Sequence, residues 1–183
     1  MRSRAVFLDR DGVLNRSTVI DGVPHPPTSV ADVEVLPGAA EACGLLHTAG
    51  LLLIVVTNQP DIARGSQTYA VVASINDTLR RRVGFDDLFM CPHDDKDQCA
   101  CRKPKPGMLL AAAAAHDIDL GNSVMVGDRD RDIAAGRVAG CRTVFIDHGY
   151  GGHPRPPADL TVRSLREAVP WIMLKTVQKA AAR

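Results

Sequence analysis

The sequence predicts an α/β fold with a doubly wound, mostly parallel sheet of five strands. Short runs of apolar residues alternate with longer amphipathic stretches, and these runs are apolar at every position. Strands of this kind are buried on both faces, which is typical of a parallel sheet covered by helices on both sides. The length of 183 residues suits one domain. We therefore expect a single domain over residues 1–183, without a large cap domain.

The expected strands and helices alternate along the chain. Strands are expected at residues 5–8, 51–56, 88–91, 123–126 and 143–146. Helices are expected between them, at residues 38–49, 68–83, 106–116 and 130–139. Proline near the start of a helix and glycine at its end mark these boundaries, as at Pro106, Gly84 and Gly140.

Two segments are expected to be less regular. Residues 15–36 form a loop that is long enough to cover a crevice at the edge of the sheet. From about residue 149 the chain is rich in Gly, Pro and His, and we expect a loop there. A final helix is expected over residues 165–182, interrupted near Pro170.

The charge balance gives no reason to expect two classes of partner. The chain has 22 basic and 21 acidic residues, for a net charge of +1. Proteins that bind nucleic acid or anionic membranes usually carry a basic excess, so we expect neither partner.

No apolar stretch approaches the roughly 20 residues that cross a bilayer, and residues 1–11 are too polar for a signal peptide. We expect a cytoplasmic protein and, since no exposed apolar stripe is evident, a monomer.

The cysteines form a pattern that favours a metal. Three of the five cysteines fall between residues 91 and 101, close to His93. In a reducing compartment such clustering favours metal binding over disulfides. Three thiolates and an imidazole make a closed tetrahedral zinc site, which is structural because no position is open to water. We expect zinc to be bound in a loop over residues 91–103, the cysteine loop, by Cys91, His93, Cys99 and Cys101.

Three of the expected strands end in polar residues: Asp9-Arg10-Asp11-Gly12, Thr57-Asn58-Gln59 and Gly127-Asp128. In α/β sheets ligands bind at the carboxyl ends of the strands, so these clusters should meet in one crevice. Carboxylates as close as Asp9 and Asp11 repel each other unless a cation offsets their charge. Magnesium prefers such oxygen ligands, and Asp128 can supply another. The pattern therefore favours a magnesium site.

Four ordered blocks resemble the haloacid dehalogenase superfamily of phosphatases: Asp9-x-Asp11, Thr57, Lys103 and Gly127-Asp128-x-x-x-Asp132. The resemblance runs from about residue 4 to about residue 150 and implies a Rossmann-like core. It implies that Asp9 is the nucleophile that forms an aspartyl-phosphate, and that Asp11 is first the general acid and then the general base.

The same resemblance assigns the remaining roles around the reacting group. Thr57 and Lys103 would hold the transferring phosphoryl group and offset its charge. Magnesium would be bound by the Asp9 carboxylate, the main-chain carbonyl of Asp11 and Asp128. Asp132 would orient Lys103 or the waters of the metal.

Longer motifs are similar to one subgroup of this superfamily. They are Asp-Arg-Asp-Gly-Val-Leu-Asn at 9–15, Thr-Asn-Gln at 57–59, Ile-Ala-Arg-Gly at 62–65 and Cys-Arg-Lys-Pro-Lys-Pro-Gly-Met at 101–108. The subgroup contains the D-glycero-D-manno-heptose 1,7-bisphosphate 7-phosphatases and the histidinol-phosphate phosphatases, and the Pro-Gly-Met ending favours the heptose enzymes. The substrate implied is a small phosphorylated sugar. A second phosphate would need cationic partners, and the expected substrate contacts are Asn15, Asn58, Gln59, Arg64, Arg102 and Arg129.

Several alternatives remain open at this point. The chain has Asp61 where the subgroup usually has Gly, and its cysteine loop is short, so histidinol phosphate or another sugar bisphosphate stays possible. A nucleic-acid 3′-phosphate is disfavoured by the net charge. A phospho-receiver domain would need an Asp at the end of the third strand, where Cys91-Pro92-His93 stands. A zinc-centred binding module leaves the Asp, Thr and Lys blocks unexplained.

Overall fold

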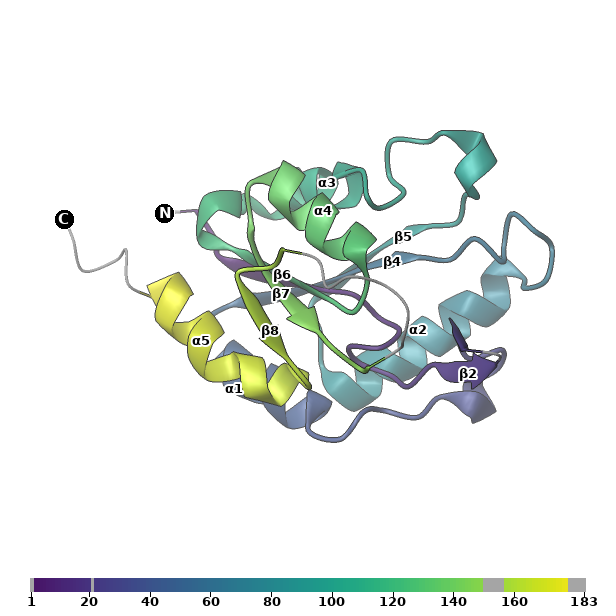
Figure 1. The fold of residues 1–183 in the computed structure, drawn as a ribbon, viewed down its shortest axis with the longest axis horizontal. Coiled ribbons are helices and arrows are strands. Elements are labelled where there is room, and N and C mark those ends of the chain that lie inside the picture. Colours follow the sequence, from purple (N-terminus) through teal and green to yellow (C-terminus); the bar gives the residue numbers. More distant parts are fainter. Residues whose placement is uncertain (1, 21, 150–156, 178–183) are drawn as a thin grey trace.

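Six parallel strands form the main sheet of the computed structural model, which describes residues 2–20, 22–149 and 157–177 (Figure 1). Their spatial order is β5-β4-β1-β6-β7-β8, so β1 lies inside the sheet. The strands are β1 (Ala5–Leu8), β4 (Leu52–Asn58), β5 (Asp87–Cys91), β6 (Val124–Gly127), β7 (Arg142–Ile146) and β8 (Leu160–Val162). The predicted fold class is confirmed, because every neighbouring pair in this sheet is parallel.

The sixth strand, β8, corrects the predicted count of five. It pairs with β7 at the edge of the sheet, Val144 opposite Leu160. The segment was missed because it is only three residues long and partly exposed. So short a run has no apolar period that separates it from a loop.

Helices cover both faces of the sheet. Figure 1 shows α3 (Gly107–His116) and α4 (Asp130–Ala139) above it, and α1 (Ala39–Thr48), α2 (Tyr69–Val83) and α5 (Leu165–Val177) below. Side chains along β1 alternate between two cores, since Val6 and Leu8 pack with the lower helices and Ala5 and Phe7 with the upper ones. This two-sided burial is why the strands are apolar at every position. None of the helices in the described ranges is both long and apolar enough to cross a membrane.

The predicted helix boundaries agree with the structure to within one residue for four helices. Thr68 caps α2 by accepting the Val71 amide at 3.2 Å, and Gly84 ends it in the left-handed conformation at φ 79°. The last helix was predicted less well, because α5 runs through Pro170 without interruption. Pro170 lies inside α5 and costs it one backbone hydrogen bond, but the buried residues Ala168, Val169 and Ile172 hold the helix against the core. Residues 178–182 of that prediction lie outside the described chain.

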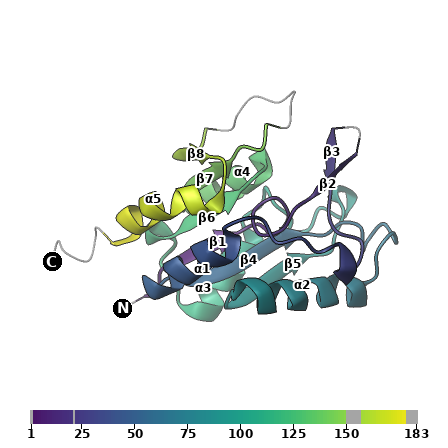
Figure 2. The same cartoon turned by 90° about the horizontal axis from the view of Figure 1, so that it is seen from below.

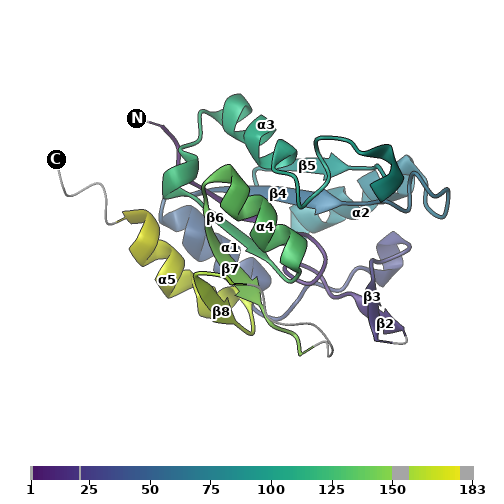
Figure 3. The same cartoon turned by 45° about the horizontal axis from the view of Figure 1, so that its top comes forward.

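The predicted loop over residues 15–36 contains a short hairpin. Its strands, β2 (Thr18–Ile20) and β3 (Val23–His25), pair antiparallel and form no pair with the main sheet. The hairpin projects from the body of the protein in both Figure 2 and Figure 3. It was not predicted because both strands are only three residues long and largely exposed.

Candidate active site

A cleft of about 410 Å³ opens at the carboxyl ends of β1, β4 and β6. The hairpin forms one part of its wall through Val23, Pro24 and His25, and the cysteine loop forms another. Most of the predicted site residues line this cleft: Asp9, Asp11, Asn58, Arg64, Arg102, Lys103, Asp128, Arg129 and Asp132. Thr57, Asn15 and Gln59 are at most 1% exposed and are not part of its lining.

Lys103 joins two of the buried carboxylates. Its Nζ lies 2.9 Å from Oδ1 of Asp9 and 2.7 Å from Oδ1 of Asp132. The ammonium also donates to the carbonyl of Val56 at 2.7 Å, so its three donors all have acceptors. Burial alone would lower the pKa of Lys103, but the charges of Asp132 and Asp9 outweigh it and raise that pKa above its ordinary value. The lysine is therefore held as a cation beside Asp9.

Asp9 sits at the junction of two strands. Its amide donates to the carbonyl of Val126 at 2.9 Å, and its Oδ1 accepts the amide of Arg10 at 2.8 Å. Burial, followed by the charge of Asp132, raises the pKa of Asp9 to about 6, although Lys103 opposes the shift. An ionised Asp9 is thus costly in this place without a further cation.

Three carboxylates lie close enough to share a metal ion. Oxygen atoms of Asp9, Asp128 and Asp132 all fall within 4.8 Å of one another. Burial and the neighbouring Asp9 raise the pKa of Asp128 well above its usual value. Its Oδ1 is buried and has no hydrogen-bond partner among the described residues. A buried acceptor of this kind, beside other carboxylates, fits a divalent cation.

Asp132 differs from Asp128 because its Oδ1 forms a close ion pair and its Oδ2 accepts a hydrogen bond. Oδ1 meets Lys103, and Oδ2 accepts the amide of Arg129 at 3.0 Å. Asp132 lies in the first turn of α4, and these contacts hold its carboxylate against the ammonium of Lys103. The geometry is that of a residue that orients its neighbours.

Asp11 is held by three side chains, one of which the sequence analysis missed. The guanidinium of Arg10 contacts both of its carboxylate oxygens, at distances between 2.9 and 3.2 Å. Asn15 and Gln59 each donate to Asp11 at 2.9 Å, so these two predicted substrate contacts reach the cleft through Asp11. Gln59 also donates to Oγ1 of Thr57 at 2.8 Å. Arg10 could have been suspected, because a charge directly after a buried strand needs a partner.

The predicted anion-binding arginines reach the cleft with carboxylates already beside them. Arg64 forms a two-pronged contact with Asp94, at 3.0 and 2.8 Å, and lies 3.6 Å from Asp61. Arg102 is similarly bound to Asp95, at 2.6 and 3.3 Å. Arg129 lies 3.5 Å from Asp128. These pairings could not be read from the sequence, because Asp94 and Asp95 are in a loop without a repeating pattern.

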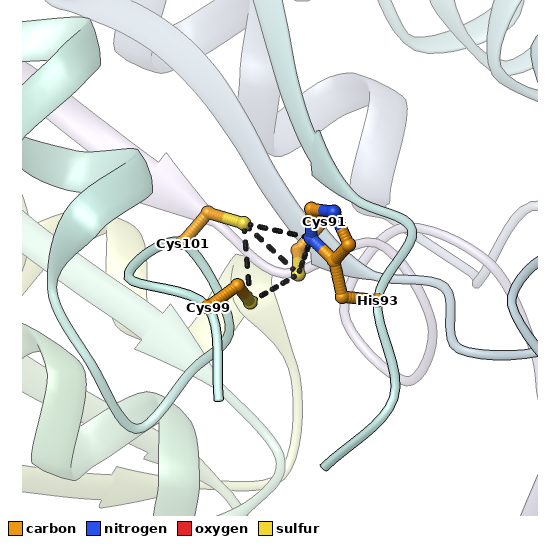
Figure 4. A group of neighbouring side chains, drawn as sticks. All are labelled: Cys91, His93, Cys99 and Cys101. Carbon is orange, nitrogen blue, oxygen red and sulfur yellow. Dashed lines mark hydrogen bonds between the residues drawn. The ribbon is translucent and has the colours of Figure 1, made fainter. Parts of the chain in front are cut away.

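The four predicted ligands of the cysteine loop converge on one point (Figure 4). The three sulfur atoms lie 3.2–3.6 Å apart, and Nδ1 of His93 lies 3.3 Å from Sγ of Cys101. Zinc with Zn–S bonds of about 2.3 Å places two tetrahedral sulfur ligands about 3.8 Å apart. The cluster therefore has nearly the size that a tetrahedral ion requires, and it can hold a metal.

The cysteine loop is connected directly to the cleft. The turn at Asp95–Asp97 is closed by Asp94 and Asp97, whose side chains bind each other's backbone amides. Two residues after Cys101, the backbone amide and carbonyl of Lys103 are both bound by the side chain of Asn58, at 3.1 and 3.0 Å. Asn58, predicted as a substrate contact, thus also ties the end of this loop to β4.

Comparison with known proteins gives the same picture. The family model described as HAD-hydrolase-like matches residues 100–168. The D-glycero-beta-D-manno-heptose-1,7-bisphosphate 7-phosphatase of Vibrio cholerae is 41% identical over 80% of this chain and 82% of its own. The D-glycero-alpha-D-manno-heptose-1,7-bisphosphate 7-phosphatase of Burkholderia mallei is 36% identical over 94% of this chain and 95% of its own.

Solved structures agree with the sequence relatives. The D,D-heptose 1,7-bisphosphate phosphatase of Bordetella bronchiseptica, crystallised with magnesium and phosphate, has a TM-score of 0.79 and 33% identity, and the match covers 94% of this chain and 99% of that one. A HAD-like phosphatase of Mesorhizobium loti has a TM-score of 0.76 and 28% identity, with 97% and 87% covered.

Proposed function

This chain belongs to the HAD-like hydrolases, in the family of the D-glycero-D-manno-heptose-1,7-bisphosphate 7-phosphatases, and from this premise we propose that it removes the 7-phosphate of a heptose 1,7-bisphosphate at Asp9. One observation carries the assignment of the reacting centre. The ammonium of Lys103 is held between Asp9 and Asp132 in the cleft, and the buried Oδ1 of Asp128 nearby has no hydrogen-bond partner within the described part of the chain.

The proposed chemistry uses two steps at one carboxylate. An oxygen of Asp9 attacks the phosphorus, the bond from phosphorus to the sugar oxygen breaks, and Asp11 gives that oxygen its proton. A water then gives its proton to Asp11 and attacks the phosphorus of the aspartyl-phosphate. The bond from phosphorus to Asp9 breaks, phosphate is released, and both aspartates return to their starting forms.

Two further side chains are proposed to hold the transferring group. Lys103 offsets the negative charge of its oxygens, since the ammonium is buried and already fixed by three acceptors. Thr57 accepts a hydrogen bond from Gln59, so its own hydroxyl proton is left to donate to a phosphoryl oxygen. Asp132 keeps Lys103 in place.

Magnesium fits the carboxylate group at the cleft floor. We propose that it is bound by Asp9, the main-chain carbonyl of Asp11 and Asp128, whose Oδ1 has no other partner among the described residues. When bound, it neutralises charge on the phosphoryl oxygens and offsets the repulsion between these carboxylates. The magnesium and phosphate in the related Bordetella bronchiseptica structure support this proposal.

Zinc is the ion we propose for the cysteine loop. Three thiolates and one imidazole are a donor set typical of a closed zinc site, which leaves no position for chemistry. The residues between His93 and Cys99 include no apolar side chain, so the metal supplies the order that packing does not. Its function would be to fix the position from which Lys103 reaches Asp9.

The second phosphate is proposed to bind in the same cleft, beside its arginines. Arg102, Arg129, Arg64 and Asn58 all line the cleft, and Arg64 is the most exposed of the three arginines. A guanidinium can bind a phosphate and a carboxylate together, because it carries five donors. The relatives are named for both anomers, so both are candidate substrates of this chain.

Comparison of substrates tests the proposal. We expect kcat/KM to be highest for heptose 1,7-bisphosphate, with both anomers tested, and much lower for histidinol phosphate and fructose 1,6-bisphosphate. The variant Asp9→Asn should release no phosphate from any of them while it keeps the wild-type circular dichroism spectrum. Turnover by Asp9→Asn would contradict the nucleophile, and preference for histidinol phosphate would contradict the substrate.

A further inference from the structure

A histidine far from the predicted motifs contacts the loop that carries the two catalytic aspartates. His148 follows β7, and its Nε2 lies 2.6 Å from the main-chain carbonyl oxygen of Gly12. A carbonyl only accepts hydrogen bonds, so Nε2 must carry the proton and donate it. The contact ties the end of β7 to the loop after β1.

The residue that receives this hydrogen bond is tightly constrained. Gly12 has φ +84°, and its amide donates to the carbonyl of Asn15 at 2.8 Å. A Cβ atom at Gly12 would lie 2.2 Å from Oδ2 of Asp128. The backbone of Gly12 therefore lies directly against one proposed magnesium ligand. Its amide belongs to the same peptide as the carbonyl of Asp11, another proposed ligand.

Packing on the other side of Gly12 is incomplete. A cavity of about 240 Å³ is lined by Gly12, His148, Leu36, Ile146 and Arg163, among others. Backbone that borders a cavity has fewer neighbouring atoms to hold it in place. The hydrogen bond from His148 is thus a specific contact that fixes the carbonyl of Gly12 beside this cavity.

We propose that His148 is a positioning residue for the magnesium site. By holding the carbonyl of Gly12, it sets the orientation of the Asp11 carbonyl and the distance from the loop to Asp128. The proposal rests on the proposed function for the identity of the metal and its ligands. It predicts that loss of the hydrogen bond weakens magnesium binding more than it slows the magnesium-saturated reaction.

The test compares three variants in the whole chain with its cysteine-loop metal retained. His148→Ala removes the donor, whereas His148→Gln places an amide donor at the same number of bonds from the backbone. His116→Ala is the matched control, because it removes a histidine that contacts Asp87. Asp87 is the first residue of β5, at the end of the strand away from the cleft. Each is titrated with Mg²⁺ alone in a calorimeter, and turnover is measured against magnesium concentration.

Outer-sphere partners of metal ligands typically contribute 10–100-fold to affinity, and we expect roughly tenfold weaker Mg²⁺ binding for His148→Ala. Its kcat at saturating magnesium should stay within about twofold of wild type, and His148→Gln should recover most of the affinity. Wild-type affinity in His148→Ala, or equal losses in the Ala and Gln variants, would overturn the proposal. Calorimetry needs no substrate, so this result is read separately from any failure of the proposed reaction.

Discussion

The side chain of Arg10 is completely buried, and its guanidinium contacts both carboxylate oxygens of Asp11 at 2.9–3.2 Å. A third nitrogen of the same group donates to Asn76 in α2 at 2.8 Å. The proposed general acid is therefore oriented from the interior by a cation that is itself anchored to a helix. A lysine at this position would keep the charge but lose the planar fork.

Arg10→Lys should lower kcat by roughly a hundredfold, the effect of displacing a reacting group by about 1 Å. KM should change much less, because Arg10 does not line the cleft. Steady-state kinetics would measure both, with Arg16→Lys as the control, since Arg16 forms an exposed ion pair with Glu34 in the same loop. An unchanged kcat in Arg10→Lys would contradict the role assigned to the fork.

Gly12→Ala should separate backbone strain from damage to the metal site. The new Cβ would collide with Asp128, whereas Gly50→Ala has a similar φ of +76° and no atom within 4 Å. Both variants should lose about 1–2 kcal/mol of unfolding free energy from the left-handed conformation. Gly12→Ala alone should also lose magnesium binding. Denaturant unfolding and calorimetry would measure the two effects, and equal magnesium affinities in both variants would count against the proposed ligand Asp128.

Removing the metal from the cysteine loop should abolish turnover without unfolding the sheet. We expect Cys99→Ser to contain less than one zinc per chain and to lose activity even with excess magnesium, because Lys103 follows the last ligand by two residues. Cys43→Ala is the control, since Cys43 is buried in α1. Zinc would be measured by atomic absorption. Full turnover in a folded, zinc-free protein would rule out the proposal that zinc fixes the position of Lys103.

Asp61→Asn should strengthen binding of a bisphosphate. Arg64 lies between Asp61 and Asp94, so this group carries one positive and two negative charges. An exposed charge of this kind is worth about 0.2–1 kcal/mol, so KM should fall by at most about fivefold, and less at high salt. The control is Asp77→Asn, an exposed carboxylate outside the cleft. A rise in KM would mean that Asp61 binds the substrate directly.

The sequence predicts the core of this protein better than its edges, for a physical reason. Residues such as Val6, Phe7 and Val55 are fully buried, and burial on both faces demands continuous apolar runs that are easily recognised. β8 and the β2–β3 hairpin are short and exposed, so their residues satisfy no comparable demand. They are visible only once their partners are placed in space.

The candidate site also divides into residues that a local sequence pattern reveals and residues that only the tertiary structure reveals. Asp9, Lys103 and Asp128 were recognised because they directly follow strands or a metal-binding motif, and the structure brings them together. Arg10 could have been suspected from its place after β1, but its anchor Asn76 required the position of α2, and His148 required a contact across 136 residues. Partners set by tertiary packing leave no local pattern.

The strand order has a consequence for how the chain folds. β1 precedes β4 and β6 in the chain, yet it lies between them in the sheet, and the amide of Ala5 donates to Ser123 across 118 residues. Contacts this distant in sequence slow folding, because the loop between them must close before any stabilisation is gained. Until β6 emerges from the ribosome, β1 has an open edge and an uncovered apolar face, which makes the growing chain prone to aggregation. The strand that precedes Asp9, the proposed nucleophile, is thus made before both of its neighbours and is enclosed only after β6 has been made.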